Sequence, residues 1–585
     1  MTHRRLPSLW RDRQGVVAPM IAVLGASLVG AAGLALDAGL YYTSSRDLRA
    51  ATEAAALAAA MYPAQATARA QQSLGRNGYD PAILQSVELG RYCPDARLTS
   101  EQRFDPSLAR CPGNGMVNAV RIRTGKPSRQ FLTRVLGAAS PIPDLAATAT
   151  AARIDEAGVG VSSGVLTVTN SLVNSVNDLL GALLGIQLRL NSGDIQTLMD
   201  GHVDAGRFFD ALASRVGESG TYDDLTGRSV GLRDMLIAAA SAADEPATAT
   251  TLTLVAGQVS NGYSVPLNGL FGLGVWKNMP VGEADEQPGL RAGLNAYQLF
   301  AFAVQAGNGA IDLSDAVSRV AAGSTVRIAA VATGPVDRPR FSFGPAGETS
   351  ASTSALRLQL NLGLNLSILG ISVDSVPVLI DIAAARADIT AIECASTAEQ
   401  ARDSRVSVLA SSGLVNAYVG NAPANAMSRP MPPLSANDIA PARILNVLNL
   451  VTADARAVAQ PVTGNSGTLT FGPGGQGTIG RPGAPGSPAT IGNGSQAGPL
   501  LSSLIGSLTA ADGLQVKPLN LCVWPLCDAS AVRSQLLGGI VAPLAGLAGT
   551  AVDPLLDNLL AALGIQLGHA TVRVTGARCG VPVLI

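Results

Sequence analysis

Residues 16–36 of this chain read VVAPMIAVLGASLVGAAGLAL, and residues 37–61 continue as DAGLYYTSSRDLRAATEAAALAAAM. The first stretch contains no charged residue, and about 20 apolar residues are needed to cross about 30 Å of hydrocarbon as a helix. The second stretch has no proline until Pro63, which stops a helix. The sequence therefore predicts a transmembrane helix over 16–36 with a helical extension over 37–62.

Charges on the two sides of the apolar run predict its orientation. Arg4, Arg5, Arg11 and Arg13 precede it against a single acidic residue, Asp12. Under the positive-inside rule, residues 1–15 are a cytoplasmic tail and everything after the span lies outside the cytoplasm. The run is longer than the roughly 7–15 apolar residues of a cleavable signal peptide, so a retained anchor is expected.

Small residues recur every fourth position along the predicted span, at Ala18, Ala22, Ala26 and Gly30. Such a stripe allows a second helix to approach closely in lipid. It also matches the general composition of spans rich in alanine and glycine, and both interpretations stay open. A second charge-free stretch, 534–552, contains Pro543 and four glycines, so a buried, broken helix pair is expected there rather than a second span.

These features resemble the N-terminal module of the TadE/TadG-like proteins of the Flp (tight-adherence) pilus assembly system, specifically the TadG branch. The matching positions are Gly15, Ala18-Pro19, Asp37-Ala38-Gly39 and the alanine-rich run 55–60. The detailed similarity covers about 60 residues. Met20 stands where a prepilin of the same system has a glutamate, so the resemblance does not extend to prepilin processing.

Many TadG-like proteins also carry a von Willebrand A domain with an Asp-x-Ser-x-Ser metal loop, which this chain lacks. The nearest strings begin at Asp105 and Asp312, and each ends in alanine, at Ala109 and Ala316. The metal-dependent adhesion of those relatives is therefore not carried over, and neither a metal nor a cofactor is expected.

Beyond the span, the sequence predicts an α+β fold with mixed helices and strands. Alternating residues indicate half-buried strands over 119–122, 146–153, 357–362 and 571–575, and a short helix is expected over 131–136. The expected segments are a small α+β domain (63–155), a large exported α+β region (156–463), a flexible segment rich in Gly, Pro and Ser (464–498), and a helix–strand region that packs with 156–463 (499–585).

All six cysteines follow the span, and an even number in an oxidising compartment favours disulfides. Cys93 with Cys111 is the best single pair because both lie in the first small domain. Three connectivities remain for the other four: Cys522 with Cys527 is the local pair, and Cys394 and Cys579 both close strand-like segments. The spacing lacks the paired Cys-x-x-Cys of zinc sites.

Enzymatic signals are weak. Ser162 lies in a G-x-S-x-G string, but the chain has only three histidines and no acid–histidine series follows in the order that the hydrolase fold requires. Residues 472–477 fit G-x-G-x-x-G inside the glycine-rich segment, without the strand that a dinucleotide site needs. His202 and Asp204, beside Arg207, are expected to form a solvated turn. The chain is therefore not expected to be an enzyme.

The net charge of −1 and the presence of only three lysines argue against nucleic-acid binding, and no small-molecule substrate is expected. The resemblance implies a membrane-anchored structural component of Flp/Tad-type pilus assembly or secretion machinery in the bacterial inner membrane. Its bulk would be periplasmic or exoplasmic. Membrane lipid, pseudopilins, the inner-membrane platform and the secretin are the implied partners. The alternatives are an anchored surface or adhesive protein and, third, an exported hydrolase using Ser162.

Overall fold

A computed structural model places most of the chain in two compact units. The structure describes residues 17–95, 97–111, 117–128, 143–162, 170–260, 262–282, 292–307, 326–333, 339–353, 355–362, 366–368, 371–373, 376–394, 403–413, 415–428, 431–447, 451–459, 465–481, 486–492, 497–510, 513–518, 530, 533–534, 537–538, 562–563 and 569–585. The first unit comprises Met1–Ile154 and Gly580–Ile585, and the second comprises Asp155–Cys579. The α+β class with a long apolar N-terminal helix is confirmed.

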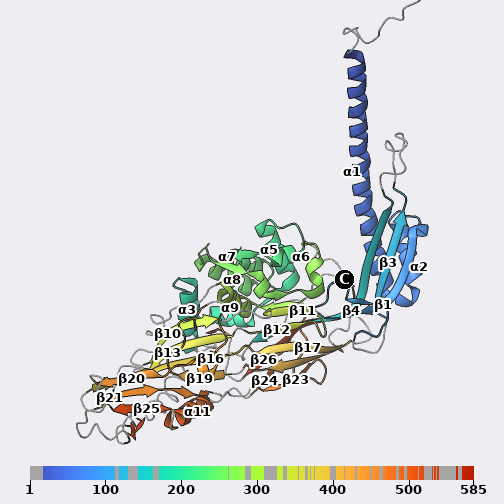
Figure 1. Ribbon diagram of the computed structural model, residues 1–585. Coiled ribbons are helices and arrows are strands. Elements are labelled where there is room, and N and C mark those ends of the chain that lie inside the picture. The colour runs from blue at the N-terminus through green and yellow to red at the C-terminus, as the bar shows by residue number, and fades with distance from the viewer. Residues whose placement is uncertain are drawn as a thin grey trace, which may run out of the picture. The chain divides into compact units, whose positions relative to one another are not determined.

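The first unit is a helix pair on an antiparallel sheet (Figure 1). Its elements are α1 (Val17–Met61), η1 (Pro63–Gln65), α2 (Ala66–Arg76), η2 (Pro81–Ile83), β1 (Leu84–Tyr92), β2 (Phe104–Asp105), β3 (Ala119–Lys126) and the first part of β4 (Leu145–Ser162). The strands follow the order β2-β1-β3-β4, and each neighbouring pair is antiparallel. The helix expected over 131–136 lies outside the described residues.

Alternation of side chains explains the core of the first unit. Val120 and Ile122 of β3 point to one face of the sheet, as do Ala149 and Ala151 of β4, and all four are buried. Because side chains alternate between the two faces of a strand, this apolar face is continuous across the sheet. The helices α1 and α2 cover it.

The second unit begins with a helical region. Its helices are α3 (Asn170–Leu184), α4 (Ser192–Asp200), α5 (Ala205–Val216), α6 (Tyr222–Thr226), α7 (Leu232–Ser241), α8 (Pro246–Gln258), η4 (Leu267–Gly269), η5 (Gly274–Asn278) and α9 (Ala296–Gly307). Short strands alternate with them: β5 (His202–Asp204), β6 (Ser229–Gly231), β7 (Ser264–Pro266), β8 (Phe271–Gly272) and β9 (Gly293–Asn295). β5 pairs with β9, and β6 with β7. Figure 1 shows these helices gathered on one side of the unit's strands.

The rest of the second unit is mainly strands. They are β10 (Val326–Thr333), β11 (Phe341–Pro345), β12 (Ser350–Ser352), β13 (Leu356–Leu362), β14 (Leu366–Ile368), β15 (Ile371–Val373), β16 (Val376–Ile382), β17 (Arg386–Glu393), β18 (Arg405–Ser411), β19 (Val415–Val419), β20 (Ala442–Val447), β21 (Val451–Ala455), β22 (Ala457–Val458), β23 (Ser466–Phe471), β24 (Ala489–Ile491), β25 (Leu514–Pro518) and β26 (Ala570–Leu584). Two further helices are η7 (Ala436–Asp438) and α11 (Ala497–Thr509).

These strands form layered sheets. One sheet has the order β12-β17-β18-β23, and a second has the order β10-β13-β16-β19-β22. Buried residues of β17, β18 and β23 form a shared apolar core with residues of β4, β24 and β26. The strands expected over 357–362 and 571–575 lie within β13 and β26.

One expectation of the sequence is wrong. The segment 464–498, expected to be flexible, contains β23, which pairs with β18 over six residues, and β24, which pairs with β26. Leu469 and Phe471 of β23 are buried in the core. Gly472 and Gly474 have φ angles of 113° and 71°, so the glycines form the tight turn after a strand.

Candidate membrane and assembly surface

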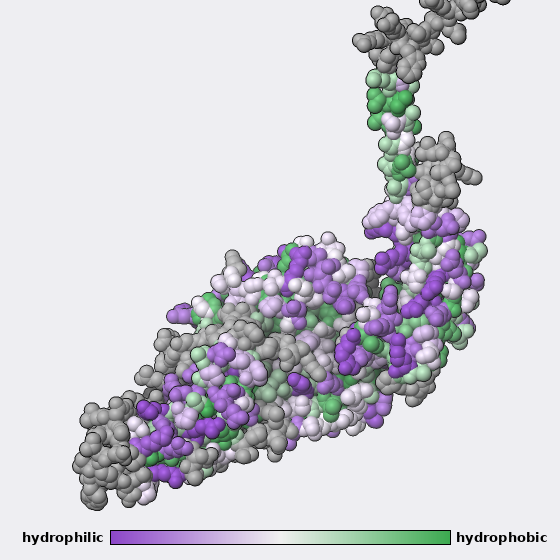
Figure 2. All heavy atoms as spheres, viewed as in Figure 1, coloured by the Kyte–Doolittle hydropathy of each residue, from purple (hydrophilic) through white to green (hydrophobic). Residues whose placement is uncertain are grey.

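The helix α1 changes character along its length. From Pro19 to Leu36 its apolar side chains are exposed; Val23, for example, is 70% exposed and Leu28 is 69% exposed. Figure 2 shows these apolar side chains along the helix. By length and composition α1 can cross a membrane, with only 6% of its most apolar window buried. Exposed apolar surface of this extent is typical of a segment that contacts lipid or another protein.

The predicted helix-pairing stripe lies on this exposed part. Ala22 and Ala26 are exposed, Gly30 is half-exposed, and Ala18 lies in the first turn of α1. A Cβ added at Gly30 would meet no atom within 4 Å, so there is open space beside the helix at this position. The pairing role of the stripe remains a prediction.

The other half of α1 forms the core of the first unit. Leu48, Ala51, Ala55 and Ala59 are buried, and they recur at the helical spacing of three to four residues. Alanine side chains are short, so the helix axis lies close to β3. The hydroxyl oxygen of Thr52 lies 2.7 Å from that of Thr124 on β3, and Thr52 also donates to the carbonyl of Leu48 at 2.7 Å.

The exposed and buried halves belong to a single unbroken helix. α1 has 45 residues, which corresponds to about 68 Å at 1.5 Å per residue. No proline follows Pro19 until Pro63. The orientation of the apolar segment therefore fixes the orientation of the first unit's core.

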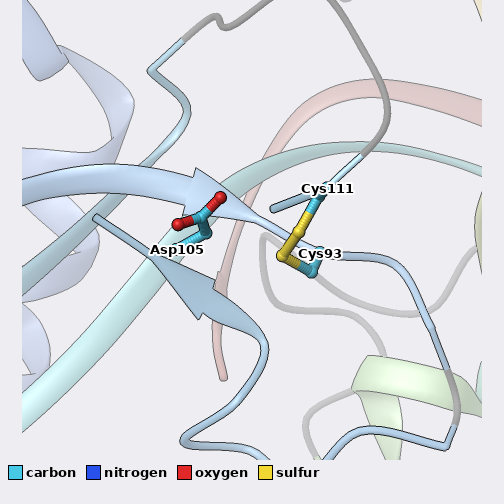
Figure 3. A group of neighbouring side chains, drawn as sticks. All are labelled: Cys93, Asp105 and Cys111. Atoms are coloured by element: carbon cyan, nitrogen blue, oxygen red, sulfur yellow. A yellow bond between two sulfur atoms is a disulfide. The ribbon is translucent and has the colours of Figure 1, made fainter. Parts of the chain in front are cut away.

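The first disulfide joins Cys93 and Cys111, the pair that the sequence favoured, with a Cα–Cα distance of 5.5 Å. Figure 3 shows the Asp105 carboxylate beside it. Asp105 accepts hydrogen bonds from the Ser107 hydroxyl and from the Ser107 and Arg110 amides. The Ser107 hydrogen bond is the main cause of the lowered pKa of Asp105. The carboxylate therefore fixes the loop that carries Cys111.

The side chains of Cys93, Asp105 and Cys111 offer three possible metal-ligand atoms within 4.8 Å of one another. A metal requires thiolates, and the two sulfur atoms are bonded to each other instead. The arrangement is that of a stapled loop. The string from Asp105 to Ala109, which resembles the Asp-x-Ser-x-Ser metal loop, takes part in this loop through Ser107.

The second disulfide joins Cys394, after β17, to Cys579 in β26, across 185 residues of sequence. Both cysteines are half-buried, and Asp155 lies close to them. Cys522 and Cys527 lie outside the described residues. Covalent closure of so long a loop removes much conformational freedom from the unfolded chain.

A buried ionic cluster lies at the start of the second unit's β4. Glu156 is 5% exposed, forms an ion pair with Arg578 of β26 and accepts a hydrogen bond from the indole N–H of Trp276. Burial raises the pKa of Glu156, and the Arg578 guanidinium opposes this effect. That guanidinium also lies 4.5 Å from the centre of the Trp276 ring. The cluster holds β26 to β4 and to η5.

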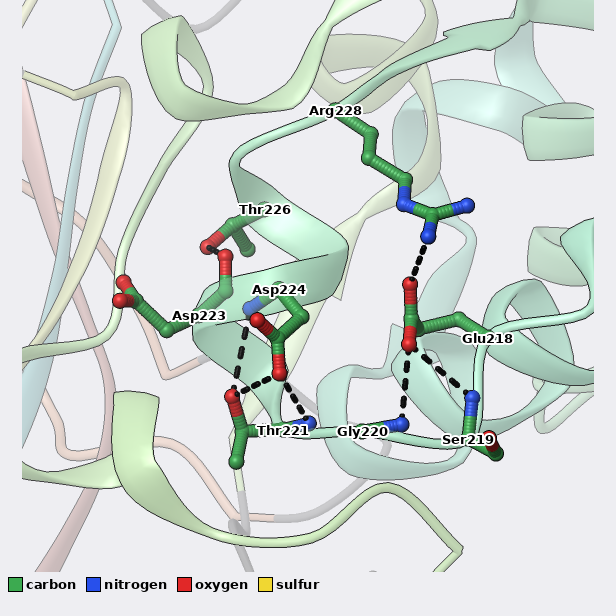
Figure 4. Close-up of polar contacts among 8 residues, drawn as sticks. All are labelled: Glu218, Ser219, Gly220, Thr221, Asp223, Asp224, Thr226 and Arg228. Carbon is green, nitrogen blue, oxygen red and sulfur yellow. Dashed lines mark hydrogen bonds and ion pairs between the residues drawn. The ribbon is translucent and has the colours of Figure 1, made fainter.

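Polar residues of the helical region form a second cluster, around α6 (Figure 4). Glu218 accepts hydrogen bonds from the Ser219 and Gly220 amides and forms an ion pair with Arg228 at 2.6 Å. Thr221 and Asp224 form a reciprocal capping box at the start of α6. The backbone hydrogen bond from Thr221 is the first cause of the lowered pKa of Asp224. These acidic groups stabilise local turns.

The residues considered for catalysis occupy structural positions. Ser162 is 4% exposed at the end of a strand, whereas a hydrolase nucleophile lies exposed on a sharp turn before a helix. The expected solvated turn at His202 and Asp204 is wrong. His202 begins β5, and buried Asp204 caps α5 by accepting a hydrogen bond from the Arg207 amide at 3.0 Å.

Two family models match parts of the chain. Residues 46–151, from the buried half of α1 into β4, match a family described as putative Tad-like Flp pilus-assembly. Residues 173–305, the helical region of the second unit, match a domain of unknown function (DUF8293). No curated protein and no solved structure matches the chain. The Tad-like match supports the resemblance that the sequence indicated; the family is one of pilus assembly and not of enzymes.

Proposed function

We propose that this protein is a membrane-anchored structural component of Flp/Tad-type pilus assembly or secretion machinery, of the TadG branch. The observation that carries the proposal is the dual character of α1. Its exposed apolar half has the length of a membrane span, and its buried half lies inside the region that matches the Tad-like family. A helix built in this way anchors a folded domain at a defined orientation to a bilayer.

The anchor works through stiffness. Between Leu36 and the first fully buried leucine, Leu48, the helix continues for about three turns. An interrupted or glycine-rich connection would let the first unit tumble, whereas a continuous helix transmits the position of the span to the unit's core. Such a component supplies a fixed platform at the membrane surface.

The charges around the span and the disulfides support the orientation. Arginines precede the apolar run, which favours a cytoplasmic N-terminus. The two disulfides of the described residues follow the run, and disulfides persist in oxidising compartments such as the periplasm. We therefore place the bulk of the protein on the periplasmic or exoplasmic side of the bacterial inner membrane.

The proposed partners are lipid and other pilus assembly proteins: pseudopilins, the inner-membrane platform and the secretin. The stripe of Ala22, Ala26 and Gly30 is the proposed contact for another span, because its small side chains allow close helix approach. Leu24 and Leu28 lie on the opposite side of the helix, at about 180° from the centre of the stripe, and are exposed.

Site-specific photocrosslinking in the native host tests the proposal. A photoreactive residue at position 26 is expected to capture a pseudopilin, the platform or the secretin, identified by mass spectrometry. The same residue at position 24 is the matched control and is expected to capture mainly lipid. If position 26 captures none of these proteins while crosslinking to lipid succeeds, the pilus assignment fails and the anchored adhesive protein becomes the leading interpretation.

A further inference from the structure

The strand β26 contributes to both compact units. Its residues up to Cys579 belong to the second unit, and Gly580–Ile585 are grouped with the first. The rest of the first unit ends at Ile154, more than 400 residues earlier in the sequence. The first unit is thus a split domain whose last strand comes from a distant part of the chain.

Residues 580–585 take part in the first unit's core. β26 pairs with β4, and the Ile585 amide donates to the Thr150 carbonyl at 3.0 Å. Leu584 packs against the apolar core that α1, α2, β3 and β4 share. Val581 and Val583 are each only 6% exposed. Both faces of this short strand are therefore buried, unlike those of a loosely attached tail.

The residues just before this strand are firmly fixed. Arg578 forms the ion pair with Glu156, and Cys579 is bonded to Cys394 with a Cα–Cα distance of 5.8 Å. Gly580 follows with a φ of 64°, a left-handed conformation that favours glycine. The backbone thus changes direction immediately after the covalent attachment point.

We propose that residues 580–585 are a strap that completes the first unit, and that the Cys394–Cys579 disulfide holds this strap in place. A segment tethered one residue from its docking site is present there at high effective concentration, whereas a free segment must first be brought to it. The disulfide in the second unit thereby contributes to the stability of the unit that contains the buried half of α1. This inference is independent of the proposed pilus function.

The strap has a consequence for folding order. Sheet and core of the first unit lack a strand until residues 570–585 have been synthesised and docked. The unit that holds the anchor helix in its core therefore reaches its full stability only after the second unit's β26 is in place.

Hydrogen exchange of the full-length protein in detergent, read by mass spectrometry, tests the inference. The readout is the exchange of β1 and β3 amides, because these strands bond to each other and not to the strap. Deletion of residues 580–585 is expected to accelerate their exchange at least about tenfold, since losing the burial of even one aliphatic side chain has an effect of this size. The Cys394→Ser/Cys579→Ser variant is expected to show a smaller acceleration in the same amides.

Matched measurements separate the strap from general unfolding. The β18 amides of the second unit report global loss of structure; if the deletion also exposes them, Leu584→Ala decides instead, with an expected several-fold acceleration confined to β1 and β3. Leu409→Ala, at a side chain 45% exposed on β18, is the control and should leave β1 and β3 unchanged. Wild-type exchange of β1 and β3 in the deletion and in Leu584→Ala overturns the strap, and wild-type exchange in the double serine variant overturns the role of the disulfide.

Discussion

Replacing Arg578 by methionine isolates the energetic role of the buried ionic cluster. Met keeps most of the side-chain volume of Arg but leaves the Glu156 carboxylate buried without its cation. Removal of one partner from a buried ion pair typically costs about 3–5 kcal/mol, because an uncompensated charge remains in a poorly solvating site. We expect a loss of this order in the free energy of unfolding of the second unit near neutral pH.

The pH dependence of this loss has a defined sign. Burial raises the folded-state pKa of Glu156 above its ordinary value of 4.5, and Arg578 lowers it. Without Arg578 the folded-state pKa rises further, so the folded protein binds a proton that the unfolded chain does not. Stability of the variant should therefore recover as the pH falls through the folded-state pKa toward the ordinary value, and decline again as the pH rises.

Urea unfolding followed by Trp276 fluorescence is the assay, since this fully buried indole donates its N–H to Glu156. Lys517→Met is the matched control: Lys517 forms an exposed ion pair with Asp454, and its loss should cost at most about 1 kcal/mol. The double variant Glu156→Gln/Arg578→Met should be more stable than Arg578→Met alone. A loss below about 1 kcal/mol for Arg578→Met, or one that is independent of pH, would refute the reasoning.

Two further predictions concern the first unit's core and the disulfides. Leu48→Ala, at a fully buried position of α1, should lower the free energy of unfolding of the first unit by about 2–5 kcal/mol in thermal or urea denaturation, and a loss within error of zero would contradict the packing described here. Cys394–Cys579 is half-buried whereas Cys93 and Cys111 are only 2% and 8% exposed, so a mild reductant followed by alkylation should label Cys394 and Cys579 first. Equal labelling of both pairs would show that burial does not control their access.

The anchor helix was predictable because its signals are local. An uncharged run reveals a span through its length alone, and the alanines at 51, 55 and 59 repeat at helical spacing in the printed sequence. The burial of Asp37, the first charged residue after the run, was not predictable. Its environment depends on residues distant in sequence, which periodicity does not report.

The wrongly predicted flexible segment shows a limit of composition. Counting Gly, Pro and Ser over 464–498 averaged two different parts of the chain. The alternation Thr468-Leu469-Thr470-Phe471 is a strand signal only four residues long, and the glycines that follow it make a turn. A shorter window, read for alternation instead of composition, would have separated β23 from its turn.

The same distinction explains why the candidate site was only half visible in the sequence. Alternation predicted a strand over 571–575, but no local pattern states that β26 pairs with β4 from the opposite end of the sequence. Cysteine spacing left three pairings open for the same reason. The structure supplies the missing constraint: once β26 lies beside β4, Arg578 reaches Glu156 and Cys579 reaches Cys394. One long-range strand pairing thus accounts for an ion pair, a disulfide and the completion of the unit that carries the anchor.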